Sequence, residues 1–112
     1  MKELDKLQSF FQALADRNRL HIIKVIGAER RSVSEIVAAT GLSQPLVSHH
    51  LRLMREQGLL ETQREGPFIY HRLKDPRLLE ALAVCADCAA HFSNDRTIRW
   101  TFCRPPWRNP GR

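Results

Sequence analysis

The chain has 112 residues, enough for one compact domain and too few for a second full core. Apolar residues make up 43% of it, which is normal for a globular protein and excludes a disordered one. Lysine and arginine total 18 against 12 aspartate and glutamate, and the formal net charge of +6 favours a polyanionic partner.

The start of the chain and its cysteines indicate the compartment. No apolar run approaches the roughly 20 residues that cross a bilayer, and residues 1–6 are charged where a secretory signal would be apolar. We therefore expect a cytoplasmic protein with no membrane partner. The three cysteines cannot all pair within one chain, so we interpret them as packing residues, metal ligands or redox groups.

The first forty residues predict three helices. Apolar residues recur at helical spacing over residues 3–15 and again over 16–28, and Gly27 falls near the end of the second stretch. Ser32 and Glu35 have the spacing of a capping box at the start of a short third helix. Gly41 is expected to end that helix, because glycine readily adopts the left-handed conformation that closes a C-terminus.

A fourth helix is predicted to begin at Ser43 and to end at Gly58. Pro45 falls in its first turn, where the missing amide proton costs little. The apolar residues of its buried face recur at i, i+4 and i+7; they are Val47, Leu51 and Met54. Because only residues 40–42 separate it from the third helix, the two form a candidate helix-turn-helix.

In the second half of the chain the sequence pattern changes from that of helices to that of strands, and then back to a helix. Residues 59–64 and 68–73 alternate in type around the turn signal at 65–67, which predicts a β-hairpin. Asp75 and Pro76 then start a fifth, mostly apolar helix. We therefore expect a mainly α fold with a small β-hairpin. Residues 1–92 would form one folded domain, and residues 93–112 a basic, proline-rich tail.

The exposed side of the fourth helix suits the major groove of DNA. Glutamine pairs with adenine, arginine with guanine or phosphate, and serine with either, and bases are read from the N-terminal end of such a helix. Any surface helix has a polar face, but the order of capped short helix, glycine turn, polar-faced helix and basic hairpin favours DNA binding. Arg64 and Arg72 of the hairpin are expected at neighbouring phosphates. The DNA-binding residues predicted on the helix are Ser43, Gln44, Pro45, Ser48, His49, Arg52 and Arg55.

The adjacent histidines of this helix are not expected to share a metal ion. Neighbouring helical residues point about 100° apart, so His49 and His50 cannot easily bind one ion together. We expect His50 to be partly buried and to pack against the core.

Two segments carry a family resemblance. Residues 13–20 (ALADRNRL) resemble the opening of the ArsR/SmtB family of metalloregulatory repressors, and residues 42–51 (LSQPLVSHHL) resemble its recognition helix. Residues 58–60 and 64–70 resemble its wing. The resemblance covers roughly residues 4–90. It implies a winged helix-turn-helix homodimer whose first and last helices form the interface. It also implies a repressor that leaves its promoter when an inducer binds.

Two metal sites common in that family do not match this sequence. Many arsenic-responsive members carry Cys-Val-Cys in the helix before the turn, where residues 34–37 here are Ser, Glu, Ile and Val. Zinc and cobalt sensors often carry Asp-x-His in the last helix, where this chain has Asp87, Cys88 and Ala89. The resemblance therefore does not identify the inducer.

The cysteines suggest a different inducer site. Cys85 and Cys88 lie three residues apart on the predicted fifth helix, and Cys103 of the tail would complete a three-thiolate site. Thiolates select thiophilic ions, and three of them suit trivalent arsenic. We expect no obligatory cofactor, and arsenite or antimonite as inducer ion ahead of cadmium, lead, mercury or zinc. His91 could add a nitrogen ligand for tetrahedral zinc or cadmium.

Other interpretations of these features stay open. The thiols could sense oxidants or persulfides without a metal, or could pack a dimer interface. The domain could bind another protein instead of DNA. We do not expect an enzyme, because the Cys85-x-x-Cys88 motif of a thioredoxin would begin a helix after a strand, whereas here it falls late in an apolar helix.

Overall fold

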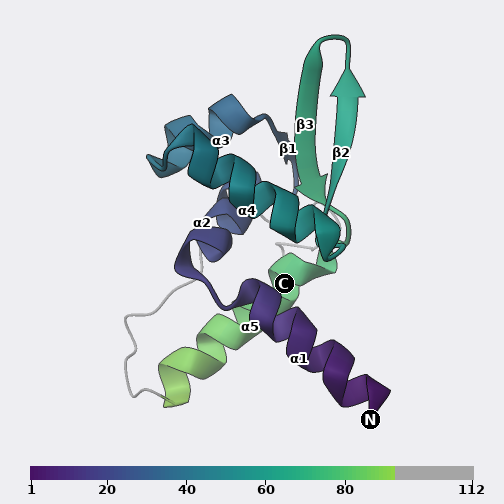
Figure 1. Ribbon diagram of the computed structural model, residues 1–112. Helices are drawn as coiled ribbons and strands as arrows, with labels where there is room; N and C mark the ends of the chain where they lie inside the picture. The colour runs from purple at the N-terminus through teal and green to yellow at the C-terminus, as the bar shows by residue number, and fades with distance from the viewer. Residues whose placement is uncertain (93–112) are drawn as a thin grey trace, which may run out of the picture.

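The computed structural model describes residues 1–92, so the predicted tail over 93–112, with Cys103, lies outside the described residues. The elements are α1 (Lys2–Leu14), α2 (Arg17–Ile26), β1 (Arg30–Arg31), α3 (Val33–Thr40), α4 (Gln44–Glu56), β2 (Leu60–Glu65), β3 (Phe68–Leu73) and α5 (Arg77–Phe92). The hairpin of β2 and β3 pairs antiparallel with the short strand β1, in the order β1-β3-β2. The hairpin stands beside α4, while α1 and α5 cross at the opposite end of the molecule (Figure 1). This is a winged helix-turn-helix, as predicted.

Local hydrogen bonds set the bounds of the helix-turn-helix. The Ser32 hydroxyl accepts from the Glu35 amide at 3.2 Å, and the Glu35 carboxylate accepts from the Ser32 amide at 2.9 Å. Gly41 ends α3 with φ +74°, a left-handed conformation that favours glycine. The Ser43 hydroxyl accepts from the Leu46 amide at 3.3 Å and caps α4. The capping box and both predicted helix starts are confirmed.

Two features of the fold were not predicted. Strand β1 is only two residues long and pairs with β3, and a run so short carries no recognisable pattern. Asp16 caps α2 through its side chain, which accepts from the amides of Asn18 and Arg19. Strand β2 also begins one residue later than predicted, because the Leu59 amide still donates to the Met54 carbonyl at the end of α4.

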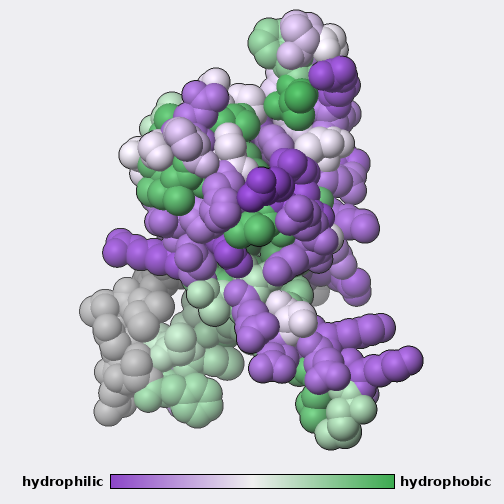
Figure 2. Space-filling view, in the orientation of Figure 1, coloured by the Kyte–Doolittle hydropathy of each residue, from purple (hydrophilic) through white to green (hydrophobic). Residues whose placement is uncertain are grey.

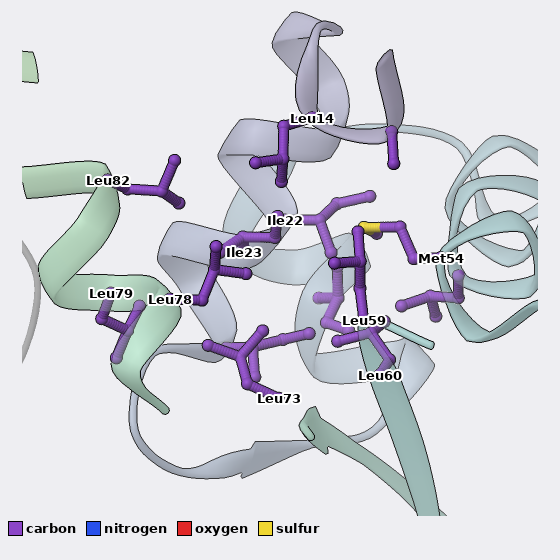
Figure 3. Close-up of a cluster of buried hydrophobic side chains, with 14 of the residues drawn as sticks. Leu14, Ile22, Ile23, Met54, Leu59, Leu60, Leu73, Leu78, Leu79 and Leu82 are labelled. Atoms are coloured by element: carbon purple, nitrogen blue, oxygen red, sulfur yellow. The ribbon is translucent and has the colours of Figure 1, made fainter. Parts of the chain in front are cut away.

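The hydrophobic core joins α2, α4, the base of the hairpin and α5 (Figure 3). The predicted inward face of α4 is confirmed, since Val47, Leu51 and Met54 are at most 1% exposed. Each such side chain contributes about 1.5–3 kcal/mol when it is removed from water. Burial of one face fixes which side of α4 points outward. The α2 and α5 residues of the core are Ile22, Ile23, Ile26, Leu78, Leu79 and Leu82.

Helix α1 contributes little to this core. Only Ala13 and Leu14, in its last turn, are buried. Its remaining large apolar side chains are 36–55% exposed; they are Leu4, Leu7, Phe10 and Phe11. No helix within residues 1–92 combines the length and apolar character needed to cross a membrane.

Candidate nucleic-acid interface

The predicted DNA-reading residues of α4 all lie on its outer surface. Ser43, at the N-cap, is exposed, and so is Pro45 in the first turn. The other five predicted residues are exposed as well; they are Gln44, Ser48, His49, Arg52 and Arg55. The Arg52 guanidinium (Nη2) lies 3.4 Å from Nδ1 of His49, one turn back along the helix. The helix thus presents amide, hydroxyl, imidazole and guanidinium groups to solvent in one continuous stripe.

A groove of about 680 Å³ separates this stripe from the hairpin. On its hairpin side lie Thr62, Ile69 and His71. On its helix side it is lined by Pro45, Ser48, His49, Arg52 and Arg55. Hydrophilic side chains gather over α4 and along the hairpin, as Figure 2 shows. The helix wall offers hydrogen-bond donors and the positive charges of Arg52 and Arg55, and the hairpin wall offers the hydroxyl of Thr62.

The two arginines predicted to contact phosphates lie on opposite faces of the hairpin. Residues directly opposite each other in an antiparallel pair share a face. Arg64 pairs with Ile69 and therefore lies on the groove face. Arg72 pairs with Glu61 on the other face, and its guanidinium donates to the Glu61 carboxylate from Nη2 at 2.8 Å and from Nε at 3.1 Å. The structure therefore places Arg64 on the face of the hairpin that is turned to the α4 residues, and Arg72 on the opposite face.

Arg30 of β1 contacts the face of the hairpin that is opposite the groove. Its guanidinium carbon lies 4.2 Å from the centroid of the Tyr70 ring, a cation–π distance. The same group forms an ion pair with Glu65 near the tip of β2. This pairing raises the pKa of Arg30 and lowers the pKa of Glu65. Sequence reasoning missed Arg30, because the contact depends on a strand register that no local pattern reveals.

His71 lies at the bottom of the groove. It is 4% exposed, and in residues 1–92 its Nδ1 is buried without a hydrogen-bond partner. Burial lowers the pKa of His71, and the positive charge of Arg55 on α4 lowers it further. The imidazole is therefore held in its neutral form next to a cationic helix face.

Comparison with known proteins assigns the family. The family model described as "Bacterial regulatory protein, arsR family" matches residues 16–62, from the start of α2 into β2. The "Probable mercury resistance operon repressor" of Streptomyces lividans is 36% identical over 86 residues, which cover 77% of this chain and 68% of that protein. The chain belongs to the ArsR family.

Other ArsR-family comparisons agree with this assignment. The transcriptional repressor SmtB homolog of Synechocystis sp. is 31% identical over 87 residues, 78% of this chain and 66% of that protein. The chain thus spans about two thirds of the length of these relatives. A homodimeric winged helix-turn-helix DNA-binding domain from Mycobacterium bovis superposes with a TM-score of 0.71 at 29% identity, covering 80% of this chain and 83% of that one.

The predicted thiol site of this ArsR-family chain is described only in part. Cys85 and Cys88 are free and exposed on α5, and lie outside the segment that the family model matches. His91 is exposed in the last turn of the same helix. Within the described part of the chain, no three His, Cys, Asp or Glu side chains gather as metal ligands. The three-thiolate site therefore stays a prediction, because its third member is Cys103.

Proposed function

We propose that this ArsR-family protein is a homodimeric transcriptional repressor that binds double-stranded DNA through α4 and the groove face of the hairpin. The observation that carries the proposal is that α4 has one buried, apolar side and one exposed, polar side. Val47, Leu51 and Met54 are almost completely buried. The predicted DNA-reading residues are exposed beside the face of the hairpin that carries Arg64; on the helix they are Gln44, Ser48, His49, Arg52 and Arg55. A helix held in this way can enter the major groove without disturbing the core.

Each exposed residue has a separate expected role. Gln44 and Ser48 lie in the N-terminal half of α4, the part of a recognition helix that reaches base edges. Arg52 and His49 can donate to acceptors on guanine, and Arg64 to a phosphate. Arg55 lies in the last turn of α4 and faces the wing. The net charge of +6 supports this electrostatic part of binding.

The exposed apolar surface of α1 supports a dimer. Leu4, Leu7 and Phe11 recur at i, i+3 and i+7 and are 50–55% exposed in the single chain. Such a stripe favours burial against another protein surface. The relative from Mycobacterium bovis is homodimeric, which supports a second copy of this chain as the partner. A dimer would place two α4 helices on two half-sites.

Binding to the DNA upstream of the protein's own gene tests the proposal. We expect a shifted complex in a gel-shift assay at low salt, and weaker binding as the salt concentration rises, because phosphate contacts release counterions. Unrelated DNA of equal length is the control. A folded dimer that shifts neither DNA would contradict the proposal and favour the alternative of a protein-interaction module.

We further propose that the thiols of α5 carry the inducing signal. Cys85 and Cys88 are accessible to solvent and lie one turn apart, so one soft ion or one oxidant can reach both. The same helix is anchored in the core through Leu78, Leu79 and Leu82. A ligand that shifted α5 would change the distance between the two α4 helices of a dimer and weaken DNA binding.

Replacing both α5 thiols tests this sensing role. With arsenite, we expect the wild type to release DNA and the double variant C85S/C88S to keep it, while both bind DNA equally without arsenite. The variant C103S tests whether the third thiol takes part. Release measured by fluorescence anisotropy at equal levels in the wild type and C85S/C88S would refute the thiol proposal. Release by polysulfide or peroxide but not by arsenite would favour the redox alternative.

A further inference from the structure

One arginine connects three helices behind the DNA-facing surface. Arg19 of α2 donates from Nε to Nδ1 of His50 at 3.3 Å, and from Nη1 to the Ala13 carbonyl at 3.2 Å. Ala13 belongs to the last turn of α1, and His50 to the middle of α4, 31 positions from Arg19 in the sequence. The guanidinium therefore ties the end of α1 and the candidate recognition helix to α2.

Asp16 completes this cluster. As the N-cap of α2, its carboxylate accepts from the amides of Asn18 at 2.9 Å and Arg19 at 3.1 Å. The hydrogen bond from the Arg19 amide is the main reason why the pKa of Asp16 is lowered. Its Oδ1 lies 4.0 Å from Nε2 of His50. The imidazole of His50, only 6% exposed, thus has a guanidinium at one nitrogen and a carboxylate near the other.

These contacts determine the tautomer of His50. A guanidinium only donates hydrogen bonds, so Nδ1 of His50 must be the unprotonated acceptor and the neutral ring carries its proton on Nε2. Burial lowers the pKa of His50, as do the charges of Arg19 and His49, while Asp16 acts in the opposite direction. These are the charged and titratable groups that act on the ring from α2 and α4. The neutral form is therefore favoured near neutral pH.

We propose that Arg19 is a positioning residue for DNA binding, which sets the rotation of α4 through its hydrogen bond to His50. The inference rests on the proposed function. Apolar contacts of Val47, Leu51 and Met54 hold α4 on the core but have little directional preference, whereas a hydrogen bond does. His49, which lies on the exposed stripe, immediately precedes His50 in the chain, and the centroids of the two rings are 5.6 Å apart. A rotation of α4 about its axis that displaced His50 would therefore also displace the DNA-facing residues.

Substitution of Arg19 tests the role, with Arg17 as a matched control on the same helix. R19M loses the hydrogen bonds to His50 and to the Ala13 carbonyl. We expect it to weaken operator binding about tenfold, the usual value of the charge-assisted hydrogen bond to His50. Arg17 is exposed at the start of α2, so R17M removes the same charge and should stay within about twofold of the wild type. R19K keeps the charge but cannot reach both acceptors in the same geometry, and should bind with intermediate affinity. Thermal unfolding of each variant identifies any that fail to fold.

Two variants of His50 separate positioning from packing. Asn places an amide oxygen close to where Nδ1 of His50 lies and can still accept from Arg19, whereas Leu fills the space without an acceptor. We expect H50N to retain more DNA affinity than H50L, although Leu suits a buried site better. Equal affinities of the two, or tighter binding by H50L, would contradict a role for the hydrogen bond.

The tautomer gives a readout that does not depend on DNA. In 15N NMR spectra of the free protein we expect a protonated Nε2 and an unprotonated Nδ1 for His50, and loss of this pattern in R19M. A proton on Nδ1 in the wild type would overturn the inference. So would an operator-binding wild type whose R19M variant binds within twofold of it. A wild type that binds no DNA would instead overturn the proposed function.

Discussion

At the scale of single residues, the surroundings of each arginine decide what it can do. Arg52 lies on the exposed stripe of α4, and its nearest polar contact is the exposed ring of His49. Arg72 is exposed too, but it donates two hydrogen bonds to Glu61 on the far face of the hairpin. A guanidinium that already pairs with a carboxylate has less to gain from a phosphate.

We predict that R52A weakens operator binding by roughly ten- to a hundredfold, the range for a lost base contact of 1–3 kcal/mol. R72A should change it by less than about threefold, because the R72A variant loses only a partly exposed ion pair. Fluorescence anisotropy at one fixed salt concentration compares the two. An equal loss in both variants would indicate that the far face of the hairpin also contacts DNA.

His71 is expected to make stability depend on pH. Its pKa is lowered in the folded chain from the ordinary value of 6.5, mainly by burial and also by Arg55. As pH falls, the unfolded chain therefore binds a proton at His71 before the folded chain does. The free energy of unfolding keeps its full value above pH 6.5 and declines as pH falls below it. The free energy of unfolding changes with pH by at most about 1.4 kcal/mol per pH unit for each such histidine.

Denaturant unfolding between pH 5 and 8 measures this slope. His50, whose pKa is also lowered, contributes with the same sign. We predict that H71L flattens the profile but leaves the His50 part, whereas H21Q, which removes an exposed imidazole, serves as the control. An H71L profile as steep as that of the wild type would show that His71 does not cause it.

At the scale of elements, caps decide where the short helices begin. Helix α3 has only eight residues, too few to be stable alone in water. Its capping box satisfies two backbone amides that would otherwise lack partners at the start of the helix. The position of α3 matters for function because the turn after it leads directly into α4.

Removal of the cap is therefore predicted to destabilise the domain. S32A should lower the free energy of unfolding by about 1 kcal/mol, the usual value of a serine N-cap. Ser34 is exposed within α3, and S34A is the matched control, with an expected change of less than about 0.5 kcal/mol. Urea denaturation followed by circular dichroism measures both. Equal stabilities of the two variants would show that the capping box contributes little.

At the scale of the whole molecule, apolar surface is left at the ends of α1 and α5, away from the hydrophilic side of α4 and the hairpin (Figure 2). Phe11 is 50% exposed, and its ring makes an edge-to-face contact with Phe10 at 5.7 Å between centroids. Val84 on α5 is 62% exposed. A single chain therefore leaves uncovered much of the apolar surface that these helices present.

We predict that F11E makes the protein monomeric at micromolar concentration, because burial of a carboxylate in an apolar interface costs several kcal/mol. Operator affinity should fall with dimerisation, since a monomer contacts one half-site. F68E, which changes a phenylalanine of the hairpin that is 58% exposed, should stay dimeric. Light scattering after size exclusion distinguishes them, and a dimeric F11E would place the interface elsewhere.

Sequence alone determined the five helices and the hairpin in their order along the chain, and the outer face of the candidate recognition helix. Ser32, Gly41 and Ser43 act through hydrogen bonds and dihedral angles within a few residues, so their signals are local and readable. The spacing of Val47, Leu51 and Met54 likewise fixed the buried side of α4, which left the polar stripe facing out. The hairpin was correct to within one residue.

Tertiary structure decided what depends on contacts between distant segments. Strand register places Arg64 and Arg72 on opposite faces, and the two-residue strand β1 brings Arg30 onto Tyr70. The partner of His50 lies 31 positions away in the chain, so only the packing of α2 on α4 could identify it. Periodicity indicates that a residue is buried or exposed, but the element it meets depends on how the whole chain packs.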